Sequence, residues 1–447
     1  MLVYNYDSHG ELVKWLNTPP FHGGIHGFES RTRHFFLLFG GVMKLLQEYR
    51  GLRKDNYILF IGRLMTSMGS MVMPMMTLIL SQKLGLSAET IAVLLFIYSL
   101  LGIPLNIIGG KMADHFSKKM VIVYCDLVSI LGSFICTILP LSFFSVMLFG
   151  FAALMQSMEM ASYSALVAEI TPAKDRERAY SLNYLGMNLG LVLAPTISGL
   201  LFKSYMWLMF LINGIAIASS TVLIYFFLGD TKVDTQENCY ENVHEEGGAM
   251  AVLKNNAPIV LFIVFAALYA AVYNQYGYLM PLELGRVFGE NGAVIFGTVS
   301  SVNCIVVVLF TPFITRTFRY LTEIQKMFVG ISLITISYVL FCLFLNQFYI
   351  HYVVMLIFTW GEIFNTISTD PYMTKRIPAS HRGRVISINM LISNLFFGLS
   401  QVIVGFIYKN AGSLVTWTMV ILTGLLAGLL CIVLYQKDKK TYPELYR

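Results

Sequence analysis

The sequence predicts an all-α polytopic membrane protein with twelve transmembrane helices in two pseudo-symmetric bundles of six. Three observations support this fold class. The 447 residues are 56% hydrophobic and 13% charged, with a mean hydropathy of +0.68, which is far above the values of soluble domains. Apolar runs long enough to cross a bilayer recur along the chain. The second half of the chain also repeats features of the first.

The apolar runs define the expected spans, and the basic residues define their orientation. The spans are expected at 57–81, 88–110, 119–140, 142–168, 178–202, 206–228, 257–281, 291–315, 321–346, 349–375, 383–408 and 413–435. An even number of spans puts both termini on one side. Loops on the other side contain few basic residues, namely Lys83, Lys203, Arg286 and Lys409. Because basic residues accumulate in cytoplasmic loops, we expect a multi-pass protein of the plasma membrane with both termini in the cytoplasm.

The repeat is visible in polar positions, which match by chance less readily than leucines do in a membrane protein. A shift of 206 residues aligns Pro172 with Pro378, Arg176 with Arg382, Asn183 with Asn389 and Lys203 with Lys409. A parallel duplication of six helices explains these matches. The net charge of +6 follows from the topology, so no nucleic-acid partner is expected.

The chain therefore divides into two bundles and three polar segments. Two readings stay open for residues 31–50, which could form an amphipathic helix on the inner membrane surface or a loosely ordered extension. The expected parts are a cytoplasmic N-terminal extension at 1–54, a first bundle at 55–228, a cytoplasmic linker at 229–256, a second bundle at 257–436 and a cytoplasmic tail at 437–447.

A short polar loop between the second and third spans carries a specific spacing. Gly110 allows close helix approach, and Asp114 can lie against the positive N-terminal end of a neighbouring helix, worth about 0.3 to 2 kcal/mol. Lys118 and Lys119 favour the anionic cytoplasmic face by about 1 kcal/mol each. The spacing indicates a conformational latch, and the alternative is an ordinary basic cytoplasmic loop.

This loop resembles the one between helices two and three of the major facilitator superfamily, in which Gly, Asp and a basic pair occur at these intervals. His115 and Ser117 stand where that family usually has Arg and Gly. The resemblance extends over residues 55–436. It implies that the first, fourth, seventh and tenth helices line a central cavity and that Asp114 docks near Arg382.

Small residues in the fifth span resemble the antiporter motif of exporters in this superfamily. The matching positions are Gly186, Gly190, Pro195 and Gly199, while Ala194 and Ser198 replace two of the motif's glycines. Small residues let membrane helices approach closely, and proline bends a helix. The match favours efflux, and a simple packing role is the alternative.

Ionisable residues inside membrane spans are costly and usually functional. Arg63, Asp126 and Glu159 are expected at a similar depth in the first bundle, so they can form a charge cluster in which one carboxylate exchanges a proton. A static ion pair that orients the helices is the alternative.

Glu362 lies in the middle of the tenth span, and no Lys or Arg is expected at its depth in the second half. Such a carboxylate should be protonated at rest and ionise when water or a cationic substrate arrives. Its Gly-Glu pair is similar to that of multidrug proton antiporters, and a permanently neutral Glu is the alternative. No Lys or Arg occurs between Lys119 and Lys174, where many such exporters have an Arg. Glu362, with Asp126 or Glu159, is left as the proton carrier.

Aromatic and amide side chains on the expected cavity helices suit a bulky amphipathic ligand. They are Tyr273, Asn274, Gln275, Tyr278 and Trp360. The six cysteines lack metal-ligand spacing and are expected to be free thiols, and no metal site, ATP-binding loop or catalytic constellation is recognised.

We therefore expect a secondary active transporter and not an enzyme. The resemblance implies the drug:proton antiporter (multidrug efflux) branch, with alternating access and efflux of an amphipathic small molecule driven by the proton gradient, without a cofactor. The expected partners are this substrate and membrane lipids, and the expected state is a monomer. The alternatives are a proton-coupled uptake symporter for a nutrient, a translocase for a lipid-linked substrate and, from another class, a membrane sensor or enzyme.

Overall fold

The computed structural model describes residues 49–172, 175–229, 253, 256–377 and 379–446. Nearly all of the expected amphipathic segment at 31–50 and most of the 229–256 linker fall outside these residues, as does Cys239. The five cysteines within them are free thiols. The described residues contain helices and turns without a strand, as the sequence predicts.

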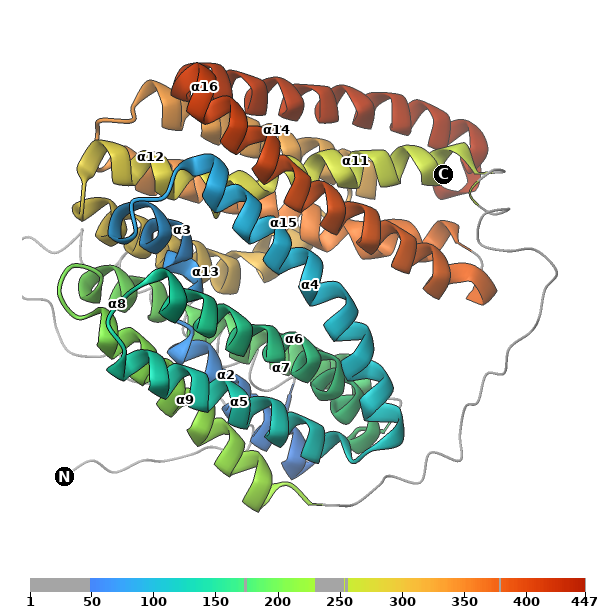
Figure 1. Ribbon diagram of the computed structural model, residues 1–447. Helices are drawn as coiled ribbons and strands as arrows, with labels where there is room; N and C mark the ends of the chain where they lie inside the picture. Colours follow the sequence, from blue (N-terminus) through green and yellow to red (C-terminus); the bar gives the residue numbers. More distant parts are fainter. Residues whose placement is uncertain (1–48, 173–174, 230–252, 254–255, 378, 447) are drawn as a thin grey trace, which may run out of the picture. The chain divides into compact units, whose positions relative to one another are not determined.

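The first half of the chain contains six spans, coloured from blue to green in Figure 1. Their helices are α2 Lys54–Gly69, α3 Met76–Leu78, α4 Ala88–His115, α5 Lys118–Ile138, α6 Phe143–Ile170, α7 Arg176–Leu191, α8 Ala194–Leu201 and α9 Met206–Phe227. In the second half they are α11 Ala257–Tyr273, α12 Leu279–Phe288, α13 Asn291–Thr317, α14 Glu323–Leu343, α15 Ile350–Arg376 and α16 Ala379–Thr441.

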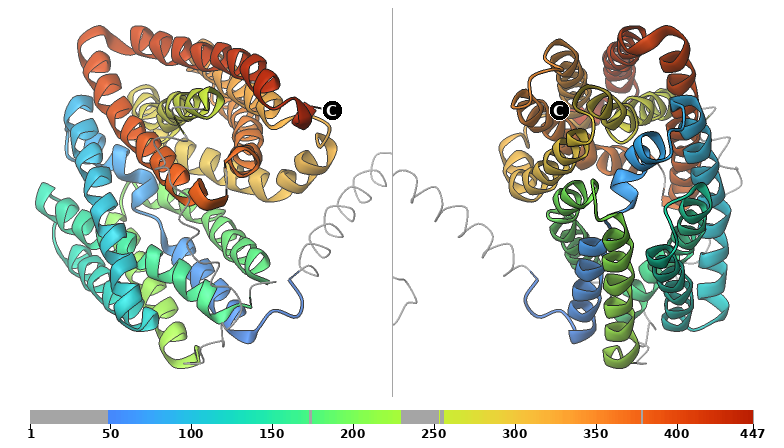
Figure 2. Two further views of the ribbon diagram at one scale, coloured as in Figure 1. Left: turned by 90° about the vertical axis from the view of Figure 1, so that its right-hand side faces the viewer. Right: turned by 60° about the vertical axis from the view of Figure 1, so that its left-hand side comes forward.

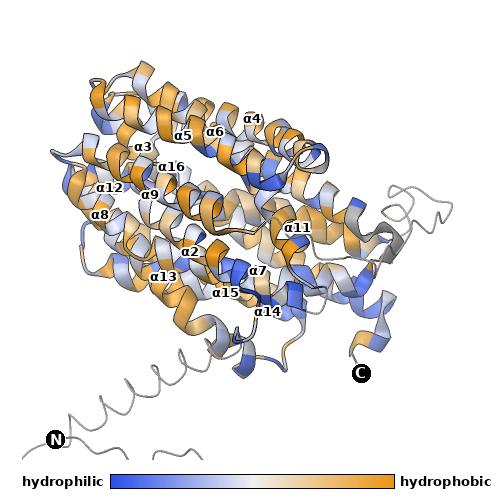
Figure 3. Ribbon diagram, turned by 90° about the horizontal axis from the view of Figure 1, so that it is seen from below, coloured by the Kyte–Doolittle hydropathy of each residue, from blue (hydrophilic) through white to orange (hydrophobic). Residues whose placement is uncertain are grey.

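Within the described residues, 11 continuous segments are long and apolar enough to span a membrane. The last of them turns back at Gly412, where φ is 79°, a left-handed conformation that glycine adopts without steric cost. This segment therefore supplies two spans, which makes twelve. Figure 3 shows hydrophobic residues along most of the helical length, as expected for helices in contact with lipid.

Three spans are interrupted. The first breaks between α2 and α3, where Pro74 opens a short turn at Met73–Met75. The fifth breaks between α7 and α8, just before Pro195, and the seventh breaks at Gly277 between α11 and α12. Because proline lacks a backbone donor, the breaks at Pro74 and Pro195 have a direct cause in the sequence. Interrupted helices at corresponding places in two halves are typical of transporter binding sites.

Each half has its own helix packing. In the first half α5 packs on α6 and α9, and α2 packs on α7 and α9; in the second, α14 packs on α15 and α11 on α16 (Figure 2). The halves meet where α4 runs along α16 and where α8 lies against α13. Close approach at these seams depends on glycine: a Cβ on Gly297 would lie 2.1 Å from the carbonyl oxygen of Pro195.

Contacts between the halves gather toward one face, which carries the turns at 84–87, 202–205 and 289–290. We call it the closed face. Among the described residues, every hydrogen bond and ion pair between the halves joins segments at this face or between it and the middle of the spans. The pairs are Thr77 with Gly277, Gln82 with Gly289, Ala88 with Tyr278, Thr196 with Ser301, Glu89 with Lys409, and Lys83 and Lys203 with Glu290.

Candidate functional site

Glu362 lies in the middle of α15, and side chains from two other helices bind its carboxylate. The hydroxyl of Tyr273 on α11 donates to Oε1 at 2.8 Å. The amide Nδ2 of Asn303 on α13 donates to Oε2 at 2.7 Å and also to Thr359 Oγ1 at 2.9 Å. Among the described residues no cation pairs with this carboxylate. Glu362 thus links three helices through neutral donors.

Aromatic rings line the side of the second half next to this carboxylate. The ring of Tyr273 stacks on Phe358 and Tyr269, with centroids 5.6 and 5.7 Å apart. Tyr276 lies 5.2 Å from Phe358. A carboxylate beside several π faces is a suitable environment for an organic cation with an apolar body.

Glu362 faces the first half of the chain. Tyr184 on α7 is 49% exposed and lies within electrostatic range of Glu362 and Cys304. Glu362 itself is only partly buried. The acid therefore lies on the side of the second half that faces the first half. No sequence signal singled out Tyr184 or Asn303.

The structure does not bring the other expected cavity residues to Glu362. Asn274 turns toward α16, where its Nδ2 donates to the carbonyl oxygen of Phe397 at 2.6 Å. Tyr278 donates to the carbonyl oxygen of Ala88 in the seam between the halves. The Trp360 ring packs 5.7 Å from Phe310, on the side of α15 away from Glu362, because two helical residues differ in direction by about 200°.

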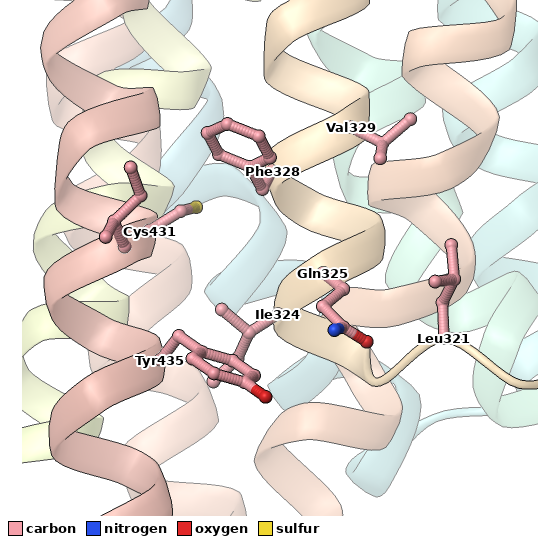
Figure 4. Close-up of a pocket in the computed structure, with 8 residues that line it drawn as sticks. Leu321, Ile324, Gln325, Phe328, Val329, Cys431 and Tyr435 are labelled. Carbon is pink, nitrogen blue, oxygen red and sulfur yellow. The ribbon is translucent and has the colours of Figure 1, made fainter.

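Gln275 lines a mainly apolar pocket between α11 and both parts of α16. A second pocket lies between α14 and the last part of α16, with Gln325 and Tyr435 as its polar residues (Figure 4). Neither pocket contains an acidic residue, so both are separate from the Glu362 site.

The structure does bring the expected charge cluster of the first half together. Asp126 on α5 and Glu159 on α6 are 5% and 7% exposed, and Asp126 lies within electrostatic range of Glu159 and of Arg63 on α2. Thr221 on α9 donates to Asp126 Oδ2 at 2.7 Å. The Arg63 guanidinium lies 4.1 Å from the centroid of the Tyr163 ring. Arg63 forms no ion pair with either carboxylate in the described part of the chain.

The loop motif is only partly as expected. A Cβ on Gly110 would meet nothing within 4 Å, whereas one on Gly109 would lie 2.3 Å from the carbonyl oxygen of Met158. The expectation that Gly110 allows close helix approach is therefore wrong by one residue. Successive helical residues differ in direction by about 100°, and it is Gly109 that faces α6.

The basic pair of this loop binds within the protein. Lys118 pairs with Glu169 at 2.6 Å, and Lys119 donates to the carbonyl oxygen of Leu228 at 2.8 Å. The side chains of Asp114 and Arg382 fall outside the described residues, so the latch between them stays a prediction.

The antiporter-motif residues lie where the fifth span meets two other spans. Gly186 and Gly190 abut α2, at Phe60 and at Leu64 with Ser67, and Gly199 abuts Ala293 of α13. A Cβ on Gly190 would lie 2.6 Å from the carbonyl oxygen of Leu64. Gly186 and Gly190 thus pack closely within the first half and Gly199 at the seam with the second half, with the helix break at Pro195 between them.

Two buried acids were not among the expected intramembrane acids, because the spans extend further than predicted. Helix α12 continues to Phe288, so Glu283 is 0% exposed and pairs with Arg286 at 2.6 Å. Helix α16 continues past 436 to Thr441, so Asp438 is a buried helical residue and not part of a tail. Asp438 receives two hydrogen bonds from Arg376, at 2.7 and 2.6 Å.

In the described residues, no three His, Cys, Asp or Glu side chains lie close enough together to bind one metal ion. The two acidic sites, at Glu362 and at Asp126 with Glu159, have carboxylates with hydroxyl or amide neighbours. A carboxylate in such a setting can bind a proton.

Comparisons with known proteins support the fold and the class of function. Residues 58–399 match the family model described as Major Facilitator Superfamily. A relative, the Na(+), Li(+), K(+)/H(+) antiporter of Planococcus maritimus, is 24% identical over 344 residues, which are 70% of this chain and 80% of that protein.

Two solved structures share the fold. A POT family transporter in complex with 5-aminolevulinic acid has a TM-score of 0.70 and 16% identity, with 86% of this chain and 96% of that chain covered. A bacterial homologue of the human lysosomal transporter Spinster, in an inward-facing and unoccupied conformation, has a TM-score of 0.66 and 14% identity, with coverage of 87% and 99%.

The family model covers well over half of the chain, and the neighbours confirm the predicted twelve-helix fold. The chain belongs to the Major Facilitator Superfamily and is a multi-pass membrane transporter, not an enzyme.

Proposed function

We propose that this transporter is a proton-coupled antiporter and that Glu362 carries the exchanged proton. One observation supports this assignment most strongly: a partly exposed carboxylate, which has no cationic partner in the part of the chain that the structure describes, connects α11, α13 and α15 through Tyr273 and Asn303. A site that must release and take up a proton needs access to water and uncharged neighbours at rest. Glu362 is partly exposed, and its hydrogen-bond partners Tyr273 and Asn303 are neutral.

Protonation changes which hydrogen-bond partners the Glu362 carboxyl group requires. The ionised carboxylate accepts from Tyr273 and Asn303, whereas the protonated acid also needs an acceptor. The Asn303 amide can supply one by turning its oxygen toward Glu362. Because Glu362 and its two partners lie on three different helices, proton exchange alters the contacts among those helices. A ligand shifts a conformational equilibrium only if it binds one conformation more tightly than the other. In this proposal, the rearranged hydrogen bonds of Glu362 are the source of that difference in affinity.

The exported ligand in this proposal is an amphipathic organic cation. The Glu362 carboxylate attracts its charge, and the partly buried rings of Tyr269, Tyr273 and Tyr276 beside it offer apolar surface to its body. Cation and proton compete for one carboxylate, so one leaves as the other binds. This competition is the elementary requirement of antiport.

A second candidate is the exchange of an alkali-metal cation for a proton. The 24% identical relative from Planococcus maritimus is named for that activity. Sodium, lithium and potassium ions prefer oxygen ligands, which both acidic sites of this chain provide.

Alternating access also requires a defined orientation, and we propose that the closed face is extracytoplasmic. The few basic residues outside the expected cytoplasmic segments, among them Lys83, Lys203 and Lys409, lie at this face, as the positive-inside rule requires. The structure then represents an inward-facing state, as does the Spinster homologue. The latch between Asp114 and Arg382 would act on the opposite face.

Proteoliposomes loaded with tetraphenylphosphonium test the proposal. An imposed proton gradient should drive the cation against proton flow in the wild type, and Glu362→Gln should abolish gradient-driven flux. Asp370→Asn is the matched control, since Asp370 is an exposed acid on the same helix. Flux in the direction of the protons would indicate a symporter, and gradient-driven flux unchanged in Glu362→Gln would contradict the assignment.

A further inference from the structure

The pocket between α11 and both parts of α16, which we call the Gln275 pocket, has the size of a small-molecule site. Its volume is about 380 Å³, within the range of roughly 300 to 1,000 Å³ that is usual for ligand sites. Most of its lining is aliphatic or aromatic, including Val272 on α11 and Met419 and Val420 on the last part of α16. None of its described lining residues is charged. The pocket therefore suits a neutral molecule with an apolar body.

One buried polar atom of this pocket lacks a hydrogen-bond partner. Gln275 is 0% exposed, and its amide Nε2 donates to the carbonyl oxygen of Ala271 at 2.8 Å. The side-chain carbonyl oxygen Oε1 of Gln275 is also buried and accepts no hydrogen bond from any described residue. A buried acceptor without a donor is unfavourable. The binding of a donor in this pocket would remove that cost.

The other polar residues of the pocket cannot supply the donor. They are Ser400 and Thr423, and a hydroxyl group carries a single O–H. Ser400 donates to the carbonyl oxygen of Phe397 at 2.7 Å, and Thr423 donates to that of Met419 at 2.9 Å. A buried water usually has about three polar partners, whereas the rest of this lining is apolar. An organic molecule with one donor fits the pocket better than water does.

The rim of the Gln275 pocket is also apolar. Phe396 and Ile403 line it from the first part of α16 and are 42% and 52% exposed. Exposed apolar side chains on a membrane span are stable in hydrocarbon and unfavourable in water. Gln275 itself lies in the short turn Asn274–Tyr276, where the seventh span is interrupted. A ligand that enters from the bilayer can therefore reach this helix break.

The pocket between α14 and the last part of α16 provides a comparison within the same chain (Figure 4). Its volume is about 370 Å³, close to that of the Gln275 pocket. The side-chain oxygen of Gln325 in this second pocket accepts from the backbone amide of Thr322 at 2.9 Å. None of its described lining residues has a buried polar atom without a partner. The two pockets thus share their size, and the unpartnered acceptor distinguishes the Gln275 pocket.

We propose that the Gln275 pocket binds a neutral, membrane-dissolved alcohol or phenol whose hydroxyl donates to Gln275 Oε1. A hydroxyl provides the missing donor with the least additional polar surface, and the apolar lining holds the body of the molecule. This site is separate from Glu362 and does not depend on the proposed antiport.

Equilibrium binding of radioactive 4-octylphenol to the purified full-length transporter in lipid nanodiscs tests the site, with empty nanodiscs as the background. The competitor 4-octylanisole has the same apolar body, but a methyl group replaces the hydroxyl hydrogen, so it cannot donate. The wild type should bind 4-octylphenol saturably. The ether should compete about tenfold more weakly, because it leaves Gln275 Oε1 without a donor.

Three variants locate the binding and its hydrogen bond. Gln275→Leu should lose the preference and bind the phenol as weakly as the wild type binds the ether. Thr423→Val is the matched control, because it keeps the shape of the pocket and removes a hydroxyl that already has an acceptor; the preference of about tenfold should remain. Ile403→Trp should obstruct the rim and weaken the binding of both probes.

Defined outcomes would overturn the site. Equal affinity of the wild type for phenol and ether, or no saturable binding, would show that no ligand donates to Gln275. Saturable phenol binding unchanged in Ile403→Trp would place the probe in another pocket and would reject the proposal. If Gln275→Leu fails to fold, the wild-type preference and Ile403→Trp decide. Glu362→Gln should bind 4-octylphenol as the wild type does, so a failure of the antiport proposal leaves this test unaffected.

Discussion

Thr77 donates a 3.1 Å hydrogen bond to the carbonyl oxygen of Gly277, and this bond joins the interrupted first and seventh spans across the seam between the halves. Both residues lie at helix breaks, where backbone carbonyls are released from the helical ladder. The two pseudo-equivalent helices therefore meet at their irregular segments. Thr77 is buried, so its hydroxyl is the local partner of that carbonyl.

Replacing Thr77 with valine should weaken the closed face. The change leaves the Gly277 carbonyl oxygen without this donor, at a cost of about 1 to 3 kcal/mol, which is enough to shift a two-state equilibrium severalfold. Thr77→Ser keeps the hydroxyl and serves as the control. Spin labels at Tyr205 and Tyr349, which are 55% and 81% exposed, report the separation of the halves. An identical distance distribution in Thr77→Val and wild type would contradict this role.

Asn303→Leu should impair transport by removing a donor to ionised Glu362. A hydrogen bond to a charged group contributes about 1.5 to 3 kcal/mol, so proton-driven flux at neutral pH should fall about tenfold or more. Raising the pH should restore part of the flux, because a higher pH itself favours the ionised form of Glu362 that the Asn303 donor stabilises. Asn303→Asp adds a second acid and should lower flux further. Equal flux in wild type and Asn303→Leu across the pH range would show that Asn303 has no part in the exchange.

Glu290 gives the closed face a pH dependence with a definite sign. The hydrogen bond from Lys83 holds the pKa of Glu290 below its ordinary value, with smaller contributions from Lys203. A lowered pKa means that the contact is fully present above the usual Glu pKa of about 4.3 and is lost as the pH falls through the lowered value. The spin-label distance between 205 and 349 should therefore stay constant between about pH 8 and pH 5 and lengthen only below the ordinary Glu range.

Glu290→Gln provides the comparison for that titration. At neutral pH this variant should already show a larger fraction of separated halves, and acid should then change it little. The remaining ion pair between Lys409 and Glu89 at 2.6 Å limits the effect of the single change. Adding Glu89→Gln should increase it. A wild-type distance that responds between pH 8 and pH 5 would assign the dependence to another group.

The buried pair of Arg376 and Asp438 should contribute to stability and not to exchange. Arg376 donates two hydrogen bonds to Asp438, and the two side chains are 1% and 0% exposed. Arg376→Leu leaves a buried carboxylate unpaired, which typically costs about 3 to 5 kcal/mol. Thermal unfolding in detergent should show the loss, and the double variant Arg376→Leu with Asp438→Leu should recover much of it. Equal loss in the double variant would argue against the pairing.

The fold was predictable because hydropathy and repetition both act over long stretches. Apolar runs identify the spans, and the repeat relates the halves; Pro74 and Pro195 also mark two of the helix breaks. Span ends were less predictable. Pro281 lies in the first turn of α12, where a missing donor does no harm, so the helix continues to the positive-φ Gly289 and buries Glu283. Asp438 is also buried near a span end, where it pairs with Arg376.

The acids of the site were identifiable from the sequence, but most of their partners were not. Glu362 stands out as a charge in an apolar span, whereas Asn303 and Tyr184 are ordinary polar residues until the helices pack. Trp360 is the opposite case: it was expected at the cavity, but it lies two residues from Glu362 in the helix and so points to another side of α15. Gly109 and Gly110 differ by one step, and only the packing on α6 distinguishes them.

The central claim is that Glu362 exchanges a proton for a cationic substrate, and proton release on substrate binding measures this directly. Purified transporter in weakly buffered detergent solution is titrated with tetraphenylphosphonium while a pH-sensitive dye records released protons. We expect the wild type and Asp370→Asn to release protons in proportion to bound cation, and Glu362→Gln to bind the cation more weakly and to release no protons at cation concentrations where binding is measured. Equal proton release by Glu362→Gln and wild type would contradict the claim.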